Sequence, residues 1–260
     1  MPKKLLLPSL RNRRRPATAY IAGHLRWLFR LLKALSIPVN KENRGENLSS
    51  NIFLCGVGGQ GLVLMTAVIG NACAKSGQNI VTGEMYGLSQ RSGAVSVHLR
   101  VGDDAFSPLI GYGDADILVA LEAIEALRYV EYLKRDGVVL MNKRIMQPPI
   151  ETSKIITGKG TKYVTVSDIV SKLKNWTPNI AVVDALKLAR DSGNVRTENT
   201  VFLGCLSALE VFPVPEKYIK ESISEAVPKK TITQNLKAFA LGKENAYNSL
   251  CTLVPCRQGQ

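Results

Sequence analysis

Histidine is nearly absent from this sequence, since 260 residues include only His24 and His98. A hydrolase with a serine or cysteine nucleophile needs an orienting base, which is usually a histidine. The sequence also lacks the GxSxG, GxxxxGK[ST] and HExxH motifs, which argues against serine hydrolases, P-loop nucleotidases and zinc proteases. We therefore expect this chain to carry no complete catalytic set of its own.

The cysteines form no pattern typical of a metal site. The five residues are Cys55, Cys73, Cys205, Cys251 and Cys256. They include no CxxC pair and no Cys/His cluster with zinc or iron-sulfur spacing, so we expect no metal centre in the chain. Reduced thiols in a cytoplasm are the simplest interpretation.

No run of eighteen apolar residues is present either, which argues against an integral membrane protein.

Acidic residues are scarce at the start of the chain. The net charge is +13, but residues 1–50 contain 11 Lys and Arg against two acids, which leaves only +4 for the remaining residues. Phosphate-backbone binding scales with the number of phosphates neutralised, so we expect no nucleic-acid binding by the main domain.

Residues 1–48 are predicted to be a basic N-terminal extension that includes an amphipathic helix over 20–35. Its apolar stripe consists of Ile21, Leu25, Leu28, Phe29, Leu32 and Leu35. Such a helix can lie on an anionic membrane or dock on a partner, and the Arg-rich composition also resembles an organellar presequence. An unstructured extension is the alternative.

Residues 49–245 read as one α/β domain in which short buried strands alternate with helices. We expect strands over 51–55, 79–82, 94–101, 116–121 and 138–142, and helices over 62–75 and 122–134. This order predicts a three-layer, Rossmann-like, mostly parallel sheet with helices on both faces.

The second half of the domain is expected to be largely helical. After a strand over 162–166, we expect helices over 167–174, 181–191, 198–211, 215–226 and 231–243. Residues 246–260 are predicted to form a C-terminal tail.

A glycine-rich turn links the first strand to the first helix. Gly56, Gly58 and Gly61 match the GxGxxG dinucleotide fingerprint, with Gly59 and Gln60 between them. The free N–H groups of the following helix attract anions. Alternatively, the glycines permit only a tight turn and close packing.

The residues after the second strand weaken the case for a nicotinamide site. Glu84 lies where such a fold holds the ribose, but a polar loop containing Ser89, Gln90 and Arg91 follows it instead of a helix. We expect this loop to face the same crevice as the glycine turn, and Asn142 to border it.

Four segments in sequence resemble the gamma-type domain of the 2-oxoacid:ferredoxin oxidoreductases, in particular the beta subunit that acts on indolepyruvate. They are NIFLCGVGGQG, GEMYGLSQRSGAVSVHLRVG, SPLIGYGDADILVALEAIEALRYVEYLKRDGVVLMN and NTVFLGCLSALEVFP, followed by the shorter NLKAFALG, and the likeness extends from about Asn51 to about Lys243.

The resemblance implies oxidative decarboxylation of an aryl 2-oxo acid with coenzyme A, which passes electrons to ferredoxin. Thiamine diphosphate and 4Fe-4S clusters would reside on a large alpha subunit, and this chain would act only with that partner. By resemblance, the residues expected to face coenzyme A or the subunit interface are Gly56, Gly58, Gly59, Gln60, Gly61, Glu84, Ser89, Gln90 and Arg91. The alternatives are a stand-alone NAD(P)-dependent dehydrogenase and a basic adaptor that binds membranes or RNA.

Overall fold

A computed structural model of the chain describes residues 49–87, 93–103, 105–146, 163–250 and 253–257, all of which belong to one unit, residues 44–260. The extension of residues 1–48, with the helix expected over 20–35, lies outside the described residues. So do Ser89, Gln90 and Arg91.

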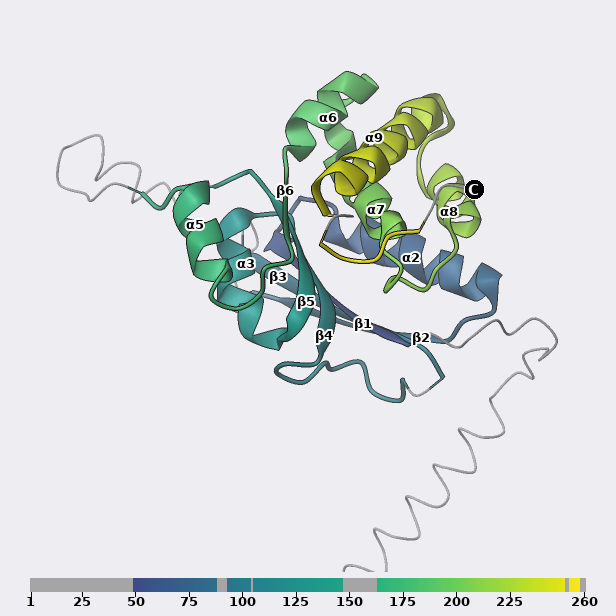
Figure 1. Cartoon of the computed structure of the whole chain (residues 1–260). Coiled ribbons are helices and arrows are strands. Elements are labelled where there is room, and N and C mark those ends of the chain that lie inside the picture. Colours follow the sequence, from purple (N-terminus) through teal and green to yellow (C-terminus); the bar gives the residue numbers. More distant parts are fainter. Residues whose placement is uncertain (1–48, 88–92, 104, 147–162, 251–252, 258–260) are drawn as a thin grey trace, which may run out of the picture. The chain divides into compact units, whose positions relative to one another are not determined.

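The described residues form a six-stranded mixed sheet with the order β2-β3-β1-β4-β5-β6 (Figure 1). The strands are β1 (Ser50–Val57), β2 (Ile80–Tyr86), β3 (Ala94–Val101), β4 (Ala115–Ala120), β5 (Leu133–Asn142) and β6 (Ile180–Val183). Neighbouring pairs among β1, β4, β5 and β6 are parallel, whereas β3 is antiparallel to both β1 and β2. The predicted mostly parallel α/β sheet is confirmed, with one antiparallel strand placed between β1 and β2.

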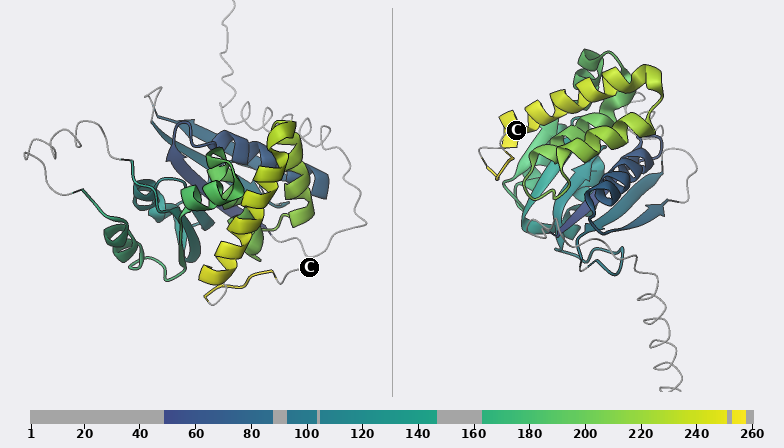
Figure 2. Two further views of the ribbon diagram at one scale, coloured as in Figure 1. Left: turned by 90° about the horizontal axis from the view of Figure 1, so that it is seen from above. Right: turned by 90° about the vertical axis from the view of Figure 1, so that its right-hand side faces the viewer.

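Helices cover both faces of the sheet, as predicted. The α-helices are α2 (Leu62–Ser76), α3 (Ala123–Tyr129), α5 (Val166–Leu173), α6 (Ala185–Ser192), α7 (Glu198–Ala208), α8 (Glu216–Ala226) and α9 (Ile232–Leu250). Short 3-10 turns are η2 (Val130–Tyr132), η3 (Val195–Thr197) and η4 (Lys229–Thr231). Figures 1 and 2 show α2, α7, α8 and α9 on one face, and α3 and α5 on the other.

Each face has its own apolar core, because β1 and β4 are buried on both sides. One core joins Ile52 and Leu54 to α2, α7 and α9, and the other joins Phe53 and Leu118 to α3 and α5. The resulting three-layer arrangement leaves the carboxyl ends of the parallel strands free to form a site.

Helix α7 is the most deeply buried of the described helices, since every residue from Asn199 to Ala208 is buried. It packs directly against α9 through two glycines. A Cβ atom at Gly204 would lie 2.0 Å from the carbonyl oxygen of Phe239, and one at Gly242 would lie 2.0 Å from that of Val201. Only glycine permits so close an approach of two backbones, so α7 is held in a fixed position.

Two sequence predictions beyond β5 are wrong. Residues 181–191 are not a single helix, because Ile180–Val183 forms β6 beside β5, and Asp184 then caps α6 by accepting from the backbone N–H of Lys187. The strand expected over 162–166 is also not found. Tyr163–Thr165 has no regular structure, and Thr165 begins α5 with a capping box.

The end of the chain is more ordered than a frayed tail. Helix α9 continues to Leu250, seven residues beyond the predicted Lys243. The backbone N–H of Arg257 donates to Ala208 O at 2.9 Å, and its guanidinium donates to Val214 O at 2.8 Å. Cys256 pairs with Leu209 in a β-bridge and is held in a disulfide, so the prediction of a reduced thiol is wrong there.

Candidate functional site

The turn between β1 and α2 is fixed by its own backbone. Gly59 and Gly61 have φ values of +92° and +83°, in the left-handed region that favours glycine. Gln60 N donates to Val57 O at 3.2 Å, and Gly58 N donates to Gly93 O at 3.0 Å. The turn therefore bonds both to itself and to the residue that precedes β3.

The side chain of Gln60 folds back over the turn rather than pointing to solvent. Its Oε1 accepts from Val57 N at 2.9 Å, and its Nε2 donates to Leu121 O at 3.3 Å. A Cβ atom at Gly56 would lie 2.6 Å from this Oε1, so glycine at position 56 makes the fold-back possible. Gln60 thus joins the turn to the end of β4.

Helix α2 begins without a neutralising group. Gly61 is its N-cap and offers no side chain, and the first turn contains no acidic residue. Within the described ranges, the N–H groups of Gly59, Gly61 and Leu62 have no hydrogen-bond acceptor. Free N–H groups and the positive end of a helix dipole together attract an anion.

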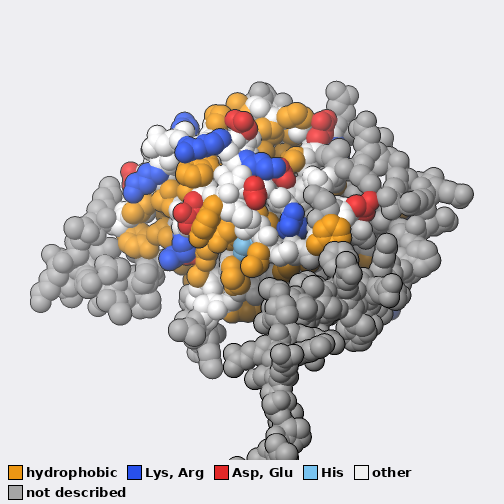
Figure 3. All heavy atoms as spheres, turned by 90° about the horizontal axis from the view of Figure 1, so that it is seen from below, with side chains coloured by type: hydrophobic (Ala, Val, Ile, Leu, Met, Phe, Trp, Pro, Cys, Tyr) orange, Lys and Arg blue, Asp and Glu red, His pale blue; other side chains and the backbone are white. Residues whose placement is uncertain are grey.

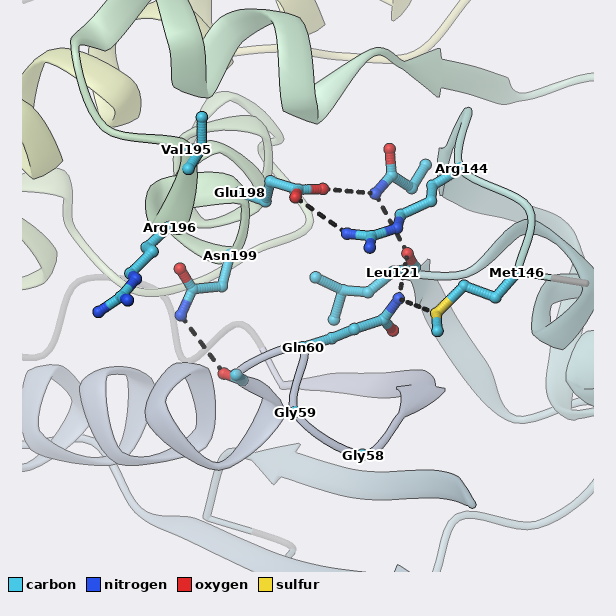
Figure 4. A pocket seen from close by; sticks show the side chains of 12 residues that line it. Gly58, Gly59, Gln60, Leu121, Arg144, Met146, Val195, Arg196, Glu198 and Asn199 are labelled. Carbon is cyan, nitrogen blue, oxygen red and sulfur yellow. Dashed lines mark hydrogen bonds and ion pairs between the residues drawn. The ribbon is translucent and has the colours of Figure 1, made fainter. Parts of the chain in front are cut away.

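Gly59 and Gly61 line a pocket of about 430 Å³ (Figure 4), whereas Leu62 lines a second pocket beside the turn. It is lined by Gly58, Gly59, Gln60, Gly61, Leu121, Asn142, Arg144, Met146, Val195, Arg196, Glu198 and Asn199. One wall is the glycine turn, another is the segment that follows β5, and a third is η3 with the start of α7. All three lie at the carboxyl edge of the parallel strands, where open α/β sheets bind ligands.

The pocket carries two arginines and one carboxylate. Arg144 Nη1 lies 3.1 Å from Glu198 Oε1, and Asn142 Nδ2 donates to Leu121 O at 3.1 Å and to Glu198 Oε2 at 3.3 Å. Figure 4 shows Arg144 and Glu198 pointing toward each other and Arg196 pointing away from them. Among the described residues Arg196 has no ion pair, so the pocket retains a positive charge.

A second, more apolar pocket of about 760 Å³ lies beside the same turn. It shares Gly58, Gly59 and Gly61 with the first and continues along α2 to Ala67 and across to Tyr86. The hydroxyl of Tyr86 donates to the Glu84 carboxylate, and this hydrogen bond raises the pKa of Tyr86 above its ordinary value.

The structure places the predicted site residues in three groups. Gly58, Gly59, Gln60 and Gly61 line the 430 Å³ pocket, and Gly56 lies under the folded-back Gln60 side chain. Glu84 lines neither pocket, although Tyr86 on the same strand lines the second one. Ser89, Gln90 and Arg91 lie outside the described residues.

Sequence reasoning missed several residues of the pocket. Asn142 borders it as expected, and the segment from Arg144 to Met146 could have been found because it follows the same strand end. Asn199 begins the NTVFLGCLSALEVFP segment that carries the family resemblance, but nothing local placed it or Glu198 at the pocket, because both enter the site only through the packing of α7.

The three buried cysteines are not poised as nucleophiles. Burial raises the pKa of both Cys73 and Cys205 to about 12. The pKa of Cys55 is raised well above its ordinary value by burial and, secondarily, by the Glu125 carboxylate. These thiols are therefore protonated at neutral pH.

Nowhere in the described ranges do three His, Cys, Asp or Glu side chains gather as a metal site would require, and none of the described helices could span a membrane.

Comparisons with known proteins agree with this architecture. Residues 51–245 match the pyruvate ferredoxin/flavodoxin oxidoreductase family. The indolepyruvate oxidoreductase subunit IorB of Archaeoglobus fulgidus is 37% identical over 196 residues, which cover 75% of this chain and 94% of that protein.

Solved structures show the same fold at lower identity. The gamma subunit of a keto/oxoacid ferredoxin oxidoreductase from Geobacter sulfurreducens has a TM-score of 0.57 and 23% identity, covering 78% of this chain and 98% of that one. The 2-oxoglutarate:ferredoxin oxidoreductase of Magnetococcus marinus, with 2-oxoglutarate, coenzyme A and succinyl-CoA bound, has a TM-score of 0.58 and 22% identity, covering 83% and 34% respectively.

Proposed function

This chain belongs to the pyruvate ferredoxin/flavodoxin oxidoreductase family, and we propose that it is the small subunit of an indolepyruvate:ferredoxin oxidoreductase. The observation that carries the proposal is the match to the IorB subunit over 94% of that protein's length. A subunit acts through its complex, so the proposed activity requires a large partner subunit, and the proposed location is the cytoplasm.

The proposed reaction converts an aryl 2-oxo acid, coenzyme A and two oxidised ferredoxins into an aryl-acyl-coenzyme A, carbon dioxide, two reduced ferredoxins and one proton. Thiamine diphosphate and 4Fe-4S clusters on the large subunit would supply the decarboxylation and the electron transfer. This chain would contribute its surface at the carboxyl edge of the sheet.

We assign the 430 Å³ pocket to a phosphate group of coenzyme A. The donor chemistry fits an anion, because among the described residues the N–H groups of Gly59 and Gly61 have no acceptor and Arg196 has no ion pair. The Magnetococcus enzyme of the same fold holds coenzyme A, which supports the choice of anion.

The arrangement of strands favours this assignment over a nicotinamide site. A Rossmann domain places the acid of its second strand next to the glycine turn, where it binds the ribose. Here the antiparallel β3 lies between β1 and β2, and Glu84 lines neither pocket beside the turn. The stand-alone dehydrogenase therefore gains no support.

The complex tests the function directly. The chain is co-expressed anaerobically with its large subunit, and ferredoxin reduction is measured with indolepyruvate, phenylpyruvate and 2-oxoglutarate. We expect coenzyme A-dependent turnover that is fastest with indolepyruvate, and none from the chain alone. Turnover by the isolated chain, or saturable micromolar binding of a nicotinamide dinucleotide to it, would refute the proposal.

A matched pair of variants tests the pocket. Gly59 has φ +92° and no atom within 4 Å of the position that a Cβ would take, and both Asp and Asn tolerate that conformation. We expect Gly59→Asp to raise the KM for coenzyme A about tenfold relative to Gly59→Asn, because the carboxylate repels phosphate. Equal KM values for the two variants would show that no anion binds there.

A further inference from the structure

The amide of Asn199, the second residue of α7, points at the glycine turn. The side chain is only 6% exposed, its Oδ1 accepts from Thr200 N at 2.9 Å, and its Nδ2 lies 3.5 Å from Gly61 O. Because the oxygen is engaged by a donor, the NH₂ group must be the end that faces Gly61. Figure 4 shows this orientation.

Asn199 also fills the space beside Gly61. A Cβ atom at Gly61 would lie 2.6 Å from Asn199 Nδ2, which no ordinary contact permits. Gly61 has φ +83° and is the residue where the turn becomes a helix, since its carbonyl oxygen accepts from Met65 N at 3.1 Å. The amide therefore contacts the turn at the point that sets the direction of the first N–H groups of α2.

The residue before Asn199 holds the opposite wall of the pocket. Glu198 binds the Arg144 guanidinium at 3.1 Å and the Asn142 amide at 3.3 Å, both on the segment that ends or follows β5. Two consecutive residues of the buried α7 thus contact two walls of one pocket. Because α7 is fixed by its direct backbone packing on α9, it offers a rigid reference for both walls.

We propose that Asn199 is a positioning residue, which holds the glycine turn so that its free N–H groups face the pocket and receive an anionic group. It acts through Gly61 and need not contact the ligand itself. The proposal rests on the proposed function, in which the anion is a phosphate of coenzyme A.

The test compares two equally buried asparagines in the complex with the large subunit. Asn235 is also 6% exposed, and its amide bonds to Thr200 Oγ1 at 2.8 Å and to Thr231 O at 2.9 Å, away from the pocket. We expect Asn199→Ala to raise the KM for coenzyme A about tenfold with kcat nearly unchanged, because small misplacements of a binding group are costly. We expect Asn235→Ala to lower the unfolding midpoint comparably while leaving that KM within about twofold.

Two further variants show whether the effect passes through Gly61. Asn199→Asp should raise the KM more than Asn199→Ala, since its carboxylate lies beside the carbonyl oxygen of Gly61 and near the N-terminus of α2. Gly61→Ala should be less damaging when combined with Asn199→Ala than in the wild-type background, because the 2.6 Å contact is gone.

The outcomes separate this inference from the proposed function. If Asn199→Ala and Asn235→Ala change the KM equally, or if Asn199→Ala leaves it unchanged while Gly59→Asp raises it, the positioning role is wrong and the coenzyme A site stands. If neither Gly59→Asp nor Asn199→Ala changes the KM for coenzyme A, the assignment of the pocket is itself wrong.

Discussion

The loops at the two edges of the sheet expose different groups: polar, positively charged ones at the carboxyl edge and apolar ones at the amino edge. At the carboxyl edge, the pocket combines Arg196 with N–H groups of the glycine turn that have no acceptor among the described residues. At the amino edge, the loop from Gly102 to Asp114 joins β3 to β4 and exposes large apolar side chains. Phe106 is 90% exposed, Tyr112 69% and Leu109 59%. Figure 3 views the sheet face that carries α3 and α5, where hydrophobic side chains lie exposed among charged ones.

Each edge is held by a buried polar side chain that reaches from a regular element to a loop. Asn199 contacts the turn at the carboxyl edge. At the amino edge, His98 Nδ1 on β3 accepts from Ile110 N at 3.0 Å, and Pro108 packs against Gly83 on β2. The contacts that hold each loop in place are therefore distinct from the groups that the loop exposes. Changes at the carboxyl edge should alter ligand affinity, and changes at the amino edge should alter stability alone.

The largest effect is expected from Gly61→Val at the carboxyl edge. A β-branched residue at φ +83° is strained, and its Cβ would lie 2.6 Å from Asn199 Nδ2. We expect a loss of about 3 kcal/mol in unfolding free energy, measured by urea denaturation, and a KM for coenzyme A raised about a hundredfold. Gly59→Ala is the control, since it carries the strain without the clash. Equal losses in both variants would contradict the role of the contact.

At the amino edge, His98→Ala should cost stability without changing ligand affinity. The substitution leaves the N–H of Ile110 buried without its acceptor and opens a cavity beside Phe53, whose ring centroid lies 4.7 Å from that of His98. We expect a loss of about 2 kcal/mol in unfolding free energy and no change in the KM for coenzyme A. A KM that rises with the loss of stability would show that the two edges are coupled.

The same histidine should make stability depend on pH. Burial lowers the pKa of His98 below its ordinary value of 6.5, so the unfolded chain binds a proton that the folded chain resists. The stabilisation is complete above pH 6.5 and is lost as the pH falls toward the folded pKa. We expect the stability of wild type relative to His98→Gln to be constant from pH 7 to 8 and to shrink from pH 6.5 to 5, measured by urea denaturation. A constant difference down to pH 5 would contradict this.

Glu198→Gln should have a smaller effect on stability, and it should lower the KM for coenzyme A rather than raise it. The ion pair with Arg144 is partly exposed, with side-chain exposures of 17% and 45%, so its loss should cost under about 1 kcal/mol. Removing the only carboxylate that lines the pocket among the described residues should lower the KM for coenzyme A about threefold at low salt. Glu225→Gln breaks a comparable exposed ion pair with Lys75 and is the control. If the KM rose in Glu198→Gln, the main role of Glu198 would be to hold Arg144 and the segment after β5 in place, and the repulsion between its carboxylate and the phosphate would be the smaller effect.

Parts of the site whose residues lie close together in the sequence could be predicted, and parts whose residues lie far apart could not. Gly58 to Gly61 could be predicted because the turn, its glycines and the helix that follows are local. Asn142 could be placed at the crevice because a parallel sheet brings its strand ends together. The contact between Asn199 and Gly61 spans 138 positions and depends on how α7 packs. No local pattern encodes that packing, so the sequence could not reveal it.

The errors in the fold have a similar cause. Ile180–Val183 is only four residues long, and its β-branched residues form a strand because β5 offers a free edge. The sequence alone does not separate this segment from the helix that follows. Nor does it reveal where α9 ends, because the last turns of that helix are stabilised by tertiary burial of Ala246 and Leu250 rather than by a strong local signal.

The smallest effect, and the sharpest check on the separation of the two edges, is expected from Phe106→Ser. Phe106 is 90% exposed, so almost none of its apolar surface is removed from water in this chain. The loop around it is held instead by Ile110 N bonding to His98 and by Gly113 N donating to Glu131 O at 2.9 Å, neither of which involves the Phe106 side chain. We therefore expect the unfolding free energy of the isolated chain, measured by urea denaturation, to change by less than about 0.5 kcal/mol.

The matched variant Phe53→Ser removes a fully buried ring from the adjoining core and should cost about 3 kcal/mol or more. A substantial loss in Phe106→Ser would mean that the loop depends on the apolar side chains it exposes, and the contrast between the edges would no longer hold.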